Sequence, residues 1–212
     1  MKGERKKPRG LLITFEGIDG CGKSTQLALT RQYLTKLGHA VHSLREPGST
    51  EIAERIRSIL LDARLDMADT TELLLYEAAR AELTAREIAP LLEKNRLVLC
   101  DRYYDSTTAY QGFGRRLDIR MVRNLHRVAV GDIKPDLTLV FDLNPKAAAA
   151  RLSDSPDRLE AQSLAFHKRV RRGFLEIARK EGRRVKVIDA TRPIQIVFED
   201  VKRHLSRKLS RR

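Results

Sequence analysis

A glycine-rich segment near the start of the chain has the residue types and the spacing of a phosphate-binding loop. Residues 17–24 read Gly-Ile-Asp-Gly-Cys-Gly-Lys-Ser and match the pattern Gly-x-x-x-x-Gly-Lys-Ser/Thr in full. Glycines let backbone N–H groups turn toward an anion, the lysine can reach the β- and γ-phosphates, and the serine hydroxyl can bind Mg²⁺. The pattern therefore predicts a nucleoside triphosphate site made of Gly17, Ile18, Asp19, Gly20, Cys21, Gly22, Lys23, Ser24 and Thr25.

Charged residues follow two further predicted strands, where a second phosphate could be held. Arg45 follows the run at 40–44, and Glu46 beside it could hold that arginine or accept from a sugar hydroxyl. On its own, however, the Arg-Glu-Pro-Gly sequence is more typical of an ordinary charged turn. Asp101 and Arg102 follow the run at 97–100. A carboxylate there would lie near Mg²⁺ and the arginine could face a phosphate, whereas the alternative is a local ion pair without a ligand. The candidate catalytic residues are Lys23, Asp101 and Arg102, and the candidate Mg²⁺ ligands are Ser24 and Asp101.

Two further groups of side chains could read a base or a sugar. Tyr76 and Arg80 are four residues apart in a helical pattern, so a ring and a guanidinium share one face. From the spacing alone, a core tyrosine and a surface arginine are the favoured interpretation. A second segment suits either a small polar ligand or a plain capped loop, and its candidates are Ser106, Thr107, Tyr110 and Gln111.

Short apolar runs alternate with helical patterns along the chain, which predicts the elements that must position these residues. Strands are predicted at 11–15, 40–44, 97–100, 137–143 and 185–188. Helices are predicted at 24–37, after a cap at Thr50, at 71–93 with a kink or end at Pro90, at 118–130, at 157–180 and from about 193, with a loop from 101 to 114. The alternation predicts an α/β fold, a doubly wound, five-stranded parallel sheet with helices on both faces. Ligands bind such folds beyond the carboxyl ends of the strands, where the candidate residues occur.

The charge of the chain is concentrated at its two ends. Among 212 residues, 42 Lys and Arg against 28 Asp and Glu give a formal net charge of +14. Residues 1–10 carry +4 and residues 201–212 carry +6, so we expect a flexible basic extension at 1–10 and a basic tail at 206–212. The length fits one domain, and no apolar run approaches the 18 residues of a transmembrane helix. Two cysteines make no disulfide framework, so a cytoplasmic location is expected.

Taken together, these segments resemble those of bacterial thymidylate kinases, which transfer the γ-phosphoryl group of ATP to dTMP. The resemblance extends over about 11–205 and implies a single P-loop nucleoside monophosphate kinase domain. Besides the phosphate loop, which many families share, it depends on Arg-Glu-Pro-Gly at 45–48, Leu-Leu-Leu-Tyr-Glu-Ala-Ala-Arg at 73–80, Asp-Arg-Tyr at 101–103, Ala-Tyr-Gln-Gly at 109–112 and Asp-Arg-Leu-Glu at 157–160. The most discriminating feature is that Arg-Glu-Pro-Gly at 45–48 is followed later in the chain by Asp-Arg-Tyr at 101–103.

The resemblance implies a role for each matching residue of the acceptor side. Arg45 and Arg102 would hold the dTMP phosphate, while Tyr76 would stack on thymine and Arg80 would bond a thymine carbonyl. Tyr110 would crowd the sugar 2′ position and favour deoxyribose. The other implied contacts are Thr107 with the base edge and Asp19 with the acceptor sugar or an acceptor-side arginine. The whole implied dTMP site is Asp19, Arg45, Tyr76, Arg80, Arg102, Ser106, Thr107, Tyr110 and Gln111.

A lid is expected at about 147–160, between the fourth predicted strand and the helix that follows it. The phosphate loop has no arginine at residues 18–21, so the positive charge on the transferred group must come from elsewhere. The resemblance to the bacterial subgroup that keeps its arginine in the lid implies Arg151 and Arg158 as catalytic residues. Residues 153–156 read Ser-Asp-Ser-Pro where basic residues are common, which leaves open which arginine acts. Arg192, after the last predicted strand, is the candidate for the adenine side.

We therefore expect a Mg²⁺-dependent kinase that phosphorylates dTMP to dTDP with ATP, a step in dTTP biosynthesis, and that forms a homodimer. The alternatives are a kinase for another nucleoside monophosphate, such as dUMP, and a P-loop ATPase that binds nucleic acid. The net charge favours the ATPase. However, the residues between the two basic ends carry only +4, aromatic residues make up 5 % and tryptophan is absent. We therefore expect no stable nucleic-acid partner and no membrane partner.

Overall fold

The computed structural model describes residues 10–152 and 156–210. Most of the predicted N-terminal extension, residues 153–155 of the predicted lid and the last two residues of the predicted C-terminal tail lie outside the described residues. Gly10, at the end of the predicted extension, is buried and donates its N–H to the carbonyl oxygen of Leu92 at 2.7 Å. The last helix reaches Leu209, so residues 206–209 belong to that helix and not to a tail.

The described residues form a five-stranded parallel sheet in the order β2-β3-β1-β4-β5. The central strand β1 is buried along its whole length, whereas no residue of the edge strand β2 is fully buried. Because both faces of the central strands are covered, most of their residues are apolar on both faces, and the few polar ones, such as Thr14, are also buried. The predicted α/β fold is confirmed. The strands are β1 (Leu11–Glu16), β2 (Val41–Arg45), β3 (Leu97–Asp101), β4 (Leu137–Asp142) and β5 (Val185–Asp189).

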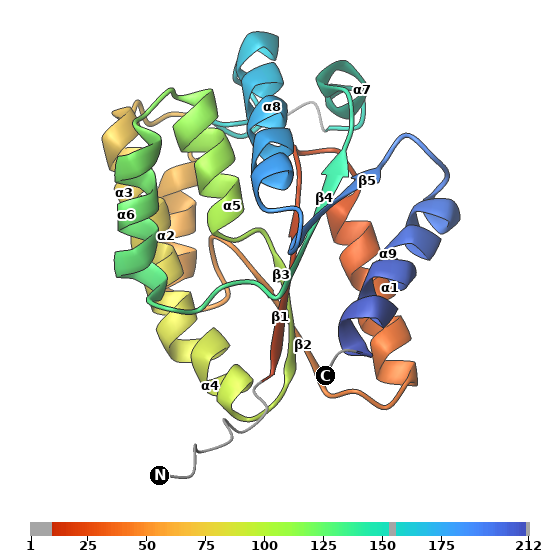
Figure 1. Ribbon diagram of the computed structural model, residues 1–212. Coiled ribbons are helices and arrows are strands. Elements are labelled where there is room, and N and C mark those ends of the chain that lie inside the picture. Colours follow the sequence, from red (N-terminus) through yellow and green to blue (C-terminus); the bar gives the residue numbers. More distant parts are fainter. Residues whose placement is uncertain (1–9, 153–155, 211–212) are drawn as a thin grey trace.

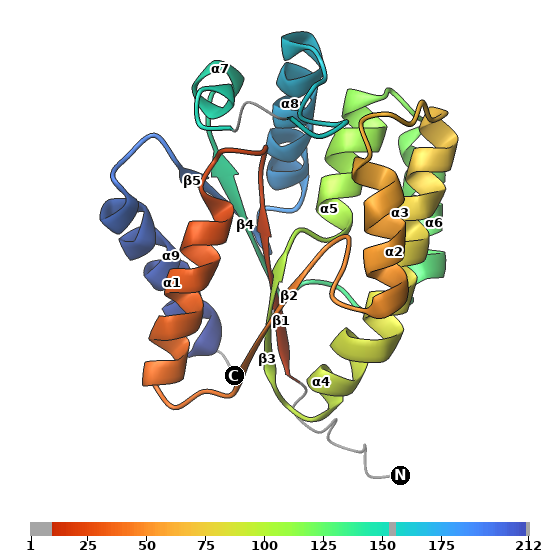
Figure 2. The ribbon, with the colours of Figure 1, turned by 180° about the vertical axis from the view of Figure 1, so that it is seen from behind.

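Helices cover both faces of this sheet (Figures 1 and 2). One face carries α1 (Lys23–Lys36) and α9 (Ile194–Leu209), which pack against each other. The helix α2 (Glu51–Leu61) packs against α3 (Asp69–Leu83), and the short α7 (Pro145–Ala149) follows β4. The other face carries α3 (Asp69–Leu83), α4 (Ala89–Glu93), α5 (Tyr104–Thr107), α6 (Ile119–Val130) and α8 (Leu164–Lys180).

Successive side chains of β1 point to opposite faces of the sheet. Ile13 and Phe15 belong to the apolar core shared with α9, whereas Leu12 packs with apolar side chains of α3 and α4. Because strand side chains alternate, Thr14 and Glu16 face the same way as Leu12. Both are fully buried polar residues. The face of the sheet that carries α5 is therefore polar near the carboxyl end of β1.

Two segments with many polar or helix-breaking residues differ from the predicted elements. The segment predicted as a loop from 101 to 114 forms α5 and the π-helical η2 (Thr108–Gly114). Its hydroxyl and amide side chains are satisfied by partners on distant elements, which the local sequence does not reveal. The helix predicted from 71 to 93 is interrupted by the π-helical η1 (Thr84–Ile88), after which Pro90 lies in the first turn of α4.

The helix predicted from Asp157 begins later, at Leu164. Ser163 caps α8 by accepting the N–H of Phe166 at 3.2 Å. The carboxylate of Asp157 caps a separate turn, where it accepts the N–H of Leu159 at 2.8 Å. Both residues are good capping types, so the sequence alone does not distinguish which of them begins the helix.

The carboxyl ends of the central strands bring the motifs together. Asp101 at the end of β3 is in register with Phe15 of β1 and with Arg45 of β2. The phosphate loop follows β1 directly and Arg102 follows β3, so they lie side by side at one edge of the sheet. In the described part of the chain, no helix is both long and apolar enough to span a membrane.

Candidate active site

The phosphate loop is a tight turn between β1 and α1. Gly17 has a φ angle of 141°, and a Cβ atom there would lie 2.7 Å from the carbonyl oxygen of Phe141, so only glycine fits. Gly22, directly before α1, has a φ angle of 90°. The helix begins at Lys23, and the N–H groups of its first turn therefore face the loop. This arrangement is suited to binding the phosphates of a nucleotide.

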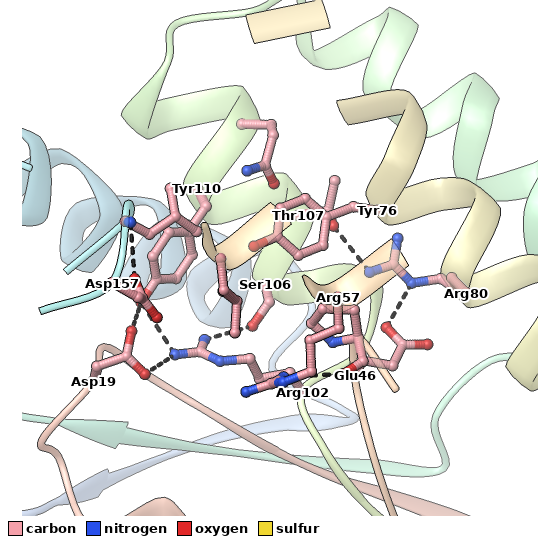
Figure 3. A pocket seen from close by; sticks show the side chains of 14 residues that line it. Asp19, Glu46, Arg57, Tyr76, Arg80, Arg102, Ser106, Thr107, Tyr110 and Asp157 are labelled. Carbon is pink, nitrogen blue, oxygen red and sulfur yellow. Dashed lines mark hydrogen bonds and ion pairs between the residues drawn. The ribbon is translucent and has the colours of Figure 1, made fainter. Parts of the chain in front are cut away.

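Arg102 is the most constrained side chain at the edge of the sheet. Its Nη1 donates to the carbonyl oxygen of Gly17 at 3.0 Å and to Oγ of Ser106 at 2.9 Å. Its Nη2 donates to Oδ1 of Asp19 at 2.6 Å, and its guanidinium lies 5.0 Å from the centre of the Tyr110 ring (Figure 3). The residue has a φ angle of 70°, a region that costs energy for a residue with a side chain. The contacts with the phosphate loop hold it there.

Asp19 is the acidic centre of this cluster. Besides Arg102, it accepts from Nζ of Lys23 at 3.1 Å and from the hydroxyl of Tyr110 at 3.0 Å. Burial alone would raise the pKa of Asp19, but the charges of Arg102 and Lys23 hold that pKa well below its usual range. One carboxylate thus lies between two cations, and the remaining positive charge suits a phosphate group.

Glu16 holds two residues that position Arg102. Its two carboxyl oxygens accept the backbone N–H of Tyr103 at 2.8 Å and the hydroxyl of Ser106 at 2.5 Å. Burial and the neighbouring Asp105 raise the pKa of Glu16, and the hydrogen bond from Ser106 lowers it only in part. Glu16 thus fixes the backbone directly after Arg102, through Tyr103, and one hydrogen-bond partner of Arg102, through Ser106.

Ser24 and Asp101 lie next to each other, as predicted for a shared metal site. The hydroxyl of Ser24 donates to Oδ2 of Asp101 at 2.7 Å. The other carboxyl oxygen, Oδ1, is buried and has no hydrogen-bond partner. Oxygen atoms of these types are the ligands that Mg²⁺ prefers. Elsewhere in the described part of the chain, no group of three or more His, Cys, Asp or Glu is placed to hold a metal.

Arg80 is buried, and the interpretation of it as a surface residue is therefore wrong. Its Nε donates to Glu46 at 2.8 Å, its Nη1 to Glu77 at 2.8 Å and its Nη2 to Oγ1 of Thr107 at 2.9 Å. Burial raises the pKa of Glu46 to about 7, although Arg80 opposes that shift. Three acceptors thus fix the guanidinium, and one N–H on each of its Nη atoms is left for a ligand.

These side chains surround one pocket, which we call the acceptor pocket (Figure 3). It lies between the phosphate loop, the turn after β2, α3 and the α5–η2 segment. Eight residues predicted from the sequence line it, namely Asp19, Tyr76, Arg80, Arg102, Ser106, Thr107, Tyr110 and Gln111. Six residues that were not among the predicted site residues complete it, namely Glu46, Pro47, Arg57, Leu61, Asp157 and Leu159.

A second pocket, the phosphate-loop pocket, lies on the other side of the loop. Arg151 reaches it from the segment after α7, where its Nη1 donates to the carbonyl oxygen of Gly20 at 3.4 Å. Arg192 lines the far end and is held by Asp200 of α9. The predicted residues that line this pocket are Gly20, Cys21, Gly22, Lys23, Ser24, Thr25, Arg151 and Arg192. Of the other predicted loop residues, Ile18 is buried and Gly17 accepts from Arg102.

Two predicted arginines lie elsewhere. Arg45 does not line the acceptor pocket, because its guanidinium is 53 % exposed and pairs with Glu54 of α2 at 2.8 Å. Arg158 does not reach the phosphate-loop pocket. It is buried and pairs at 2.6 Å with Glu72, a residue of α3 that is fully buried. Arg158 is therefore packed against α3, whereas a lid arginine was expected to lie beside the phosphate loop.

The residues that sequence reasoning missed are those whose direction depends on the fold. Arg57 comes from the middle of α2, where nothing in its spacing separates it from other surface arginines. Its Nη1 donates to the carbonyl oxygen of Pro47 at 2.9 Å, which anchors it at the mouth of the acceptor pocket. Glu46 was within the Arg-Glu-Pro-Gly motif, where it was expected to hold Arg45 or to accept from a sugar hydroxyl. It holds Arg80 instead.

Comparisons with known proteins agree with this geometry. The thymidylate kinase family matches residues 15–201. The chain is 47 % identical to a thymidylate kinase of Geobacter sulfurreducens, over 96 % of this chain and 100 % of that protein. It is 45 % identical to one of Symbiobacterium thermophilum, over 95 % of each chain. The crystal structure of thymidylate kinase from Ehrlichia chaffeensis is similar with a TM-score of 0.77 and 34 % identity, covering 93 % of this chain and 99 % of that one.

Proposed function

The chain belongs to the thymidylate kinase family, and we propose that its acceptor pocket binds dTMP while its phosphate-loop pocket binds ATP. The enzyme phosphorylates dTMP to dTDP at the expense of ATP. The observation that carries the assignment of the two pockets is the position of Arg102. This residue lines the acceptor pocket and also donates to Gly17 and Asp19 of the phosphate loop.

The reaction proceeds by attack of a dTMP phosphate oxygen on the γ-phosphorus of ATP, while the bond from that phosphorus to the bridging oxygen of the β-phosphate breaks and ADP leaves. The acceptor is already an anion, so the residues act by positioning and charge, and no dedicated base is needed. In the acceptor pocket we assign Arg102 and Arg57 to the dTMP phosphate, and Arg80 and Thr107 to the thymine edge. Tyr76 lies beside them as the stacking partner, and Tyr110 contacts the sugar.

Arg45 is left out of this assignment because it pairs with Glu54 outside the pocket. Catalytic lid function is assigned to Arg151, the lid arginine that lines the phosphate-loop pocket. Arg158 is given a structural role in place of a catalytic one because it is buried against Glu72. The kinase domain then comprises residues 11–205, with a lid between 147 and 160.

Ser24 and Asp101 fit a Mg²⁺ ion. The buried Oδ1 of Asp101 lacks a hydrogen-bond partner, and the hydroxyl of Ser24 lies beside the same carboxylate. A bound Mg²⁺ would neutralise charge on the β- and γ-phosphates. The two protein oxygens are too few to hold the ion without phosphate and water, which is the usual arrangement for Mg²⁺ at nucleotides.

We also propose a homodimer that forms through the exposed side of α2, α3 and α6. These helices lie side by side (Figures 1 and 2) and expose large apolar side chains, of which Val128 is 83 % exposed. Exposed apolar surface of this kind is typical of subunit contacts. The other members of the patch are Ile52, Ile59 and Leu74. Analytical ultracentrifugation should give twice the mass of the chain, and Val128→Asp should shift the population toward the monomer.

Cys21 and Cys100 are buried free thiols, in keeping with a cytoplasmic enzyme.

Release of ADP, measured in a coupled assay across all nucleoside monophosphates with and without single-stranded DNA, tests the proposed function. We expect turnover with dTMP, and with dUMP only at lower efficiency. ADP release that is stimulated by DNA but not by dTMP would contradict the assignment.

A further inference from the structure

Gln111 lines the acceptor pocket, and its hydrogen bond to Glu72 determines which way its amide group points. The residue is buried in η2, and its Nε2 donates to Oε1 of Glu72 at 2.7 Å. If the amide were turned over, its oxygen would face a carboxylate oxygen at the same short distance, and two acceptors would repel each other. The amide oxygen Oε1 is therefore the group that Gln111 can offer to a ligand, and no residue in the described part of the chain donates to it.

Glu72 is held as a carboxylate by cations on two sides. Its Oε2 accepts from Nη2 of Arg115 at 2.9 Å and from Nη1 of Arg158 at 2.6 Å, while Nε of Arg115 lies 3.2 Å from Oε1. Burial would raise the pKa of Glu72, but hydrogen bonds from Arg115 and Gln111 and the two arginine charges lower it below its usual range. The carboxylate is fully buried and does not itself line the acceptor pocket.

Two kinds of group thus face the base position from one side of the pocket. Arg80 contributes N–H donors, since three of its five are used by Glu46, Glu77 and Thr107. Gln111 contributes an acceptor. A pyrimidine with a carbonyl next to a ring N–H, as in thymine and uracil, matches a donor beside an acceptor. Cytosine carries an amino group beside a bare ring nitrogen, which reverses both partners.

We propose that Glu72 is a positioning residue that sets base specificity by fixing the amide of Gln111 with its oxygen toward the base. The pocket then accepts pyrimidine nucleoside monophosphates with a ring N–H and rejects the cytosine nucleotide. The inference rests on the proposed dTMP site and adds to it a residue that touches no substrate.

Glu72→Gln tests the proposal with little change in shape. The single oxygen of the new amide accepts from Arg115 and Arg158, so the NH₂ group at position 72 faces Gln111. That NH₂ group favours the turned-over orientation of the Gln111 amide. We expect the ratio of kcat/KM for dTMP to kcat/KM for dCMP to fall by about tenfold to a hundredfold. The ratio for dTMP to dUMP, which share the same edge, should stay within twofold of wild type.

Asp69→Asn is the matched control. Asp69 is on the same helix and lies 3.3 Å from the same arginine, Arg115, but it does not contact Gln111. The control should leave the dTMP to dCMP ratio unchanged. If Glu72→Gln fails to fold, Gln111→Met removes the acceptor while the Glu72 carboxylate keeps its contacts with Arg115 and Arg158, and it should lower the ratio by reducing dTMP turnover.

The outcomes separate the two levels of the argument. A wild-type enzyme that does not turn over dTMP would refute the proposed function itself. Turnover of dTMP by wild type with an unchanged dTMP to dCMP ratio in both Glu72→Gln and Gln111→Met would refute only the role of Glu72. An equal loss with every nucleotide would show that Glu72 is merely structural.

Discussion

Arg57→Ala should weaken the use of dTMP far more than Arg45→Ala, although only Arg45 belongs to a motif that the sequence marks. Arg57 lines the acceptor pocket and donates one N–H to the carbonyl oxygen of Pro47, so the other N–H groups of its guanidinium are left for a phosphate. Arg45 is outside the pocket and both oxygens of Glu54 accept from its Nη2 at 2.8 Å. The two variants remove the same charge from the same region of the fold.

The expected size of the difference follows from what each arginine contacts. A hydrogen bond to a charged group contributes about 1.5–3 kcal/mol, so loss of Arg57 should raise the KM for dTMP by roughly 10- to 150-fold. The ion pair of Arg45 is 53 % exposed on the arginine side and 41 % on the glutamate side. Such a surface pair contributes about 0.2–1 kcal/mol to stability, and its loss should not change the KM for dTMP by more than about twofold.

Steady-state ADP release at varied dTMP and saturating ATP measures both effects. The KM for ATP, determined at saturating dTMP, serves as the internal control and should be unchanged in both variants. Arg57→Lys should recover part of the loss, because it restores the charge without the planar guanidinium. If Arg45→Ala raised the KM for dTMP as much as Arg57→Ala, the phosphate assignment drawn from the pocket would be wrong.

Three further predictions concern the lid, the metal and the pH dependence of stability. Arg151→Ala should lower kcat at least about a hundredfold with little change in the KM for dTMP. Arg158→Ala should instead lower the melting temperature, because breaking its buried ion pair with Glu72 costs about 3–5 kcal/mol. A selective loss of kcat in Arg158→Ala alone would reverse these roles. Asp101→Asn should raise the Mg²⁺ concentration needed for half-maximal ADP release, and an unchanged Mg²⁺ titration would exclude Asp101 from the metal site. Burial raises the pKa of Glu46 from 4.5 to about 7, so the folded state holds a proton there that the unfolded state has lost, and stability should fall by about 3 kcal/mol as pH rises from 4.5 to 7 and then level off with respect to this group. Urea unfolding at pH 5 and pH 8 should show a smaller difference in Glu46→Gln than in wild type, and an equal difference would show that Glu46 does not titrate in this range.

The parts of the fold that could be predicted from the sequence are those with local causes. The apolar run of β1 and the glycines that follow it determine a buried strand and a turn that only glycine can adopt, so the phosphate loop was predictable down to its residues. The cap at Thr50 was also correct, since its hydroxyl accepts the N–H of Ala53 at 3.2 Å. These features depend on neighbours within a few positions.

The parts that could not be predicted depend on partners far along the chain. Arg80 was assigned to the surface from its spacing because two of its three acceptors, in the turn after β2 and in α5, are far from it in the sequence and come close only in the folded chain. Ser106 was read as a loop residue for the same reason, although it joins Glu16 to Arg102 across nearly ninety positions. Polar residues buried in a helix look like loop residues until their partners are known.

The long-range contacts also explain why the acceptor side can be specific while the phosphate side is general. In the proposed ATP site the groups beside the phosphate loop are the backbone N–H groups of the first turn of α1 and Lys23, which suit the phosphates of any nucleotide. In the acceptor pocket the two groups proposed to face the base, Arg80 and Gln111, are each fixed by buried residues. Glu46 and Glu77 hold Arg80, and Glu72 holds Gln111. Since a fixed group cannot turn to suit a different base, the proposed discrimination depends on these buried carboxylates as much as on the side chains assigned to the nucleotide.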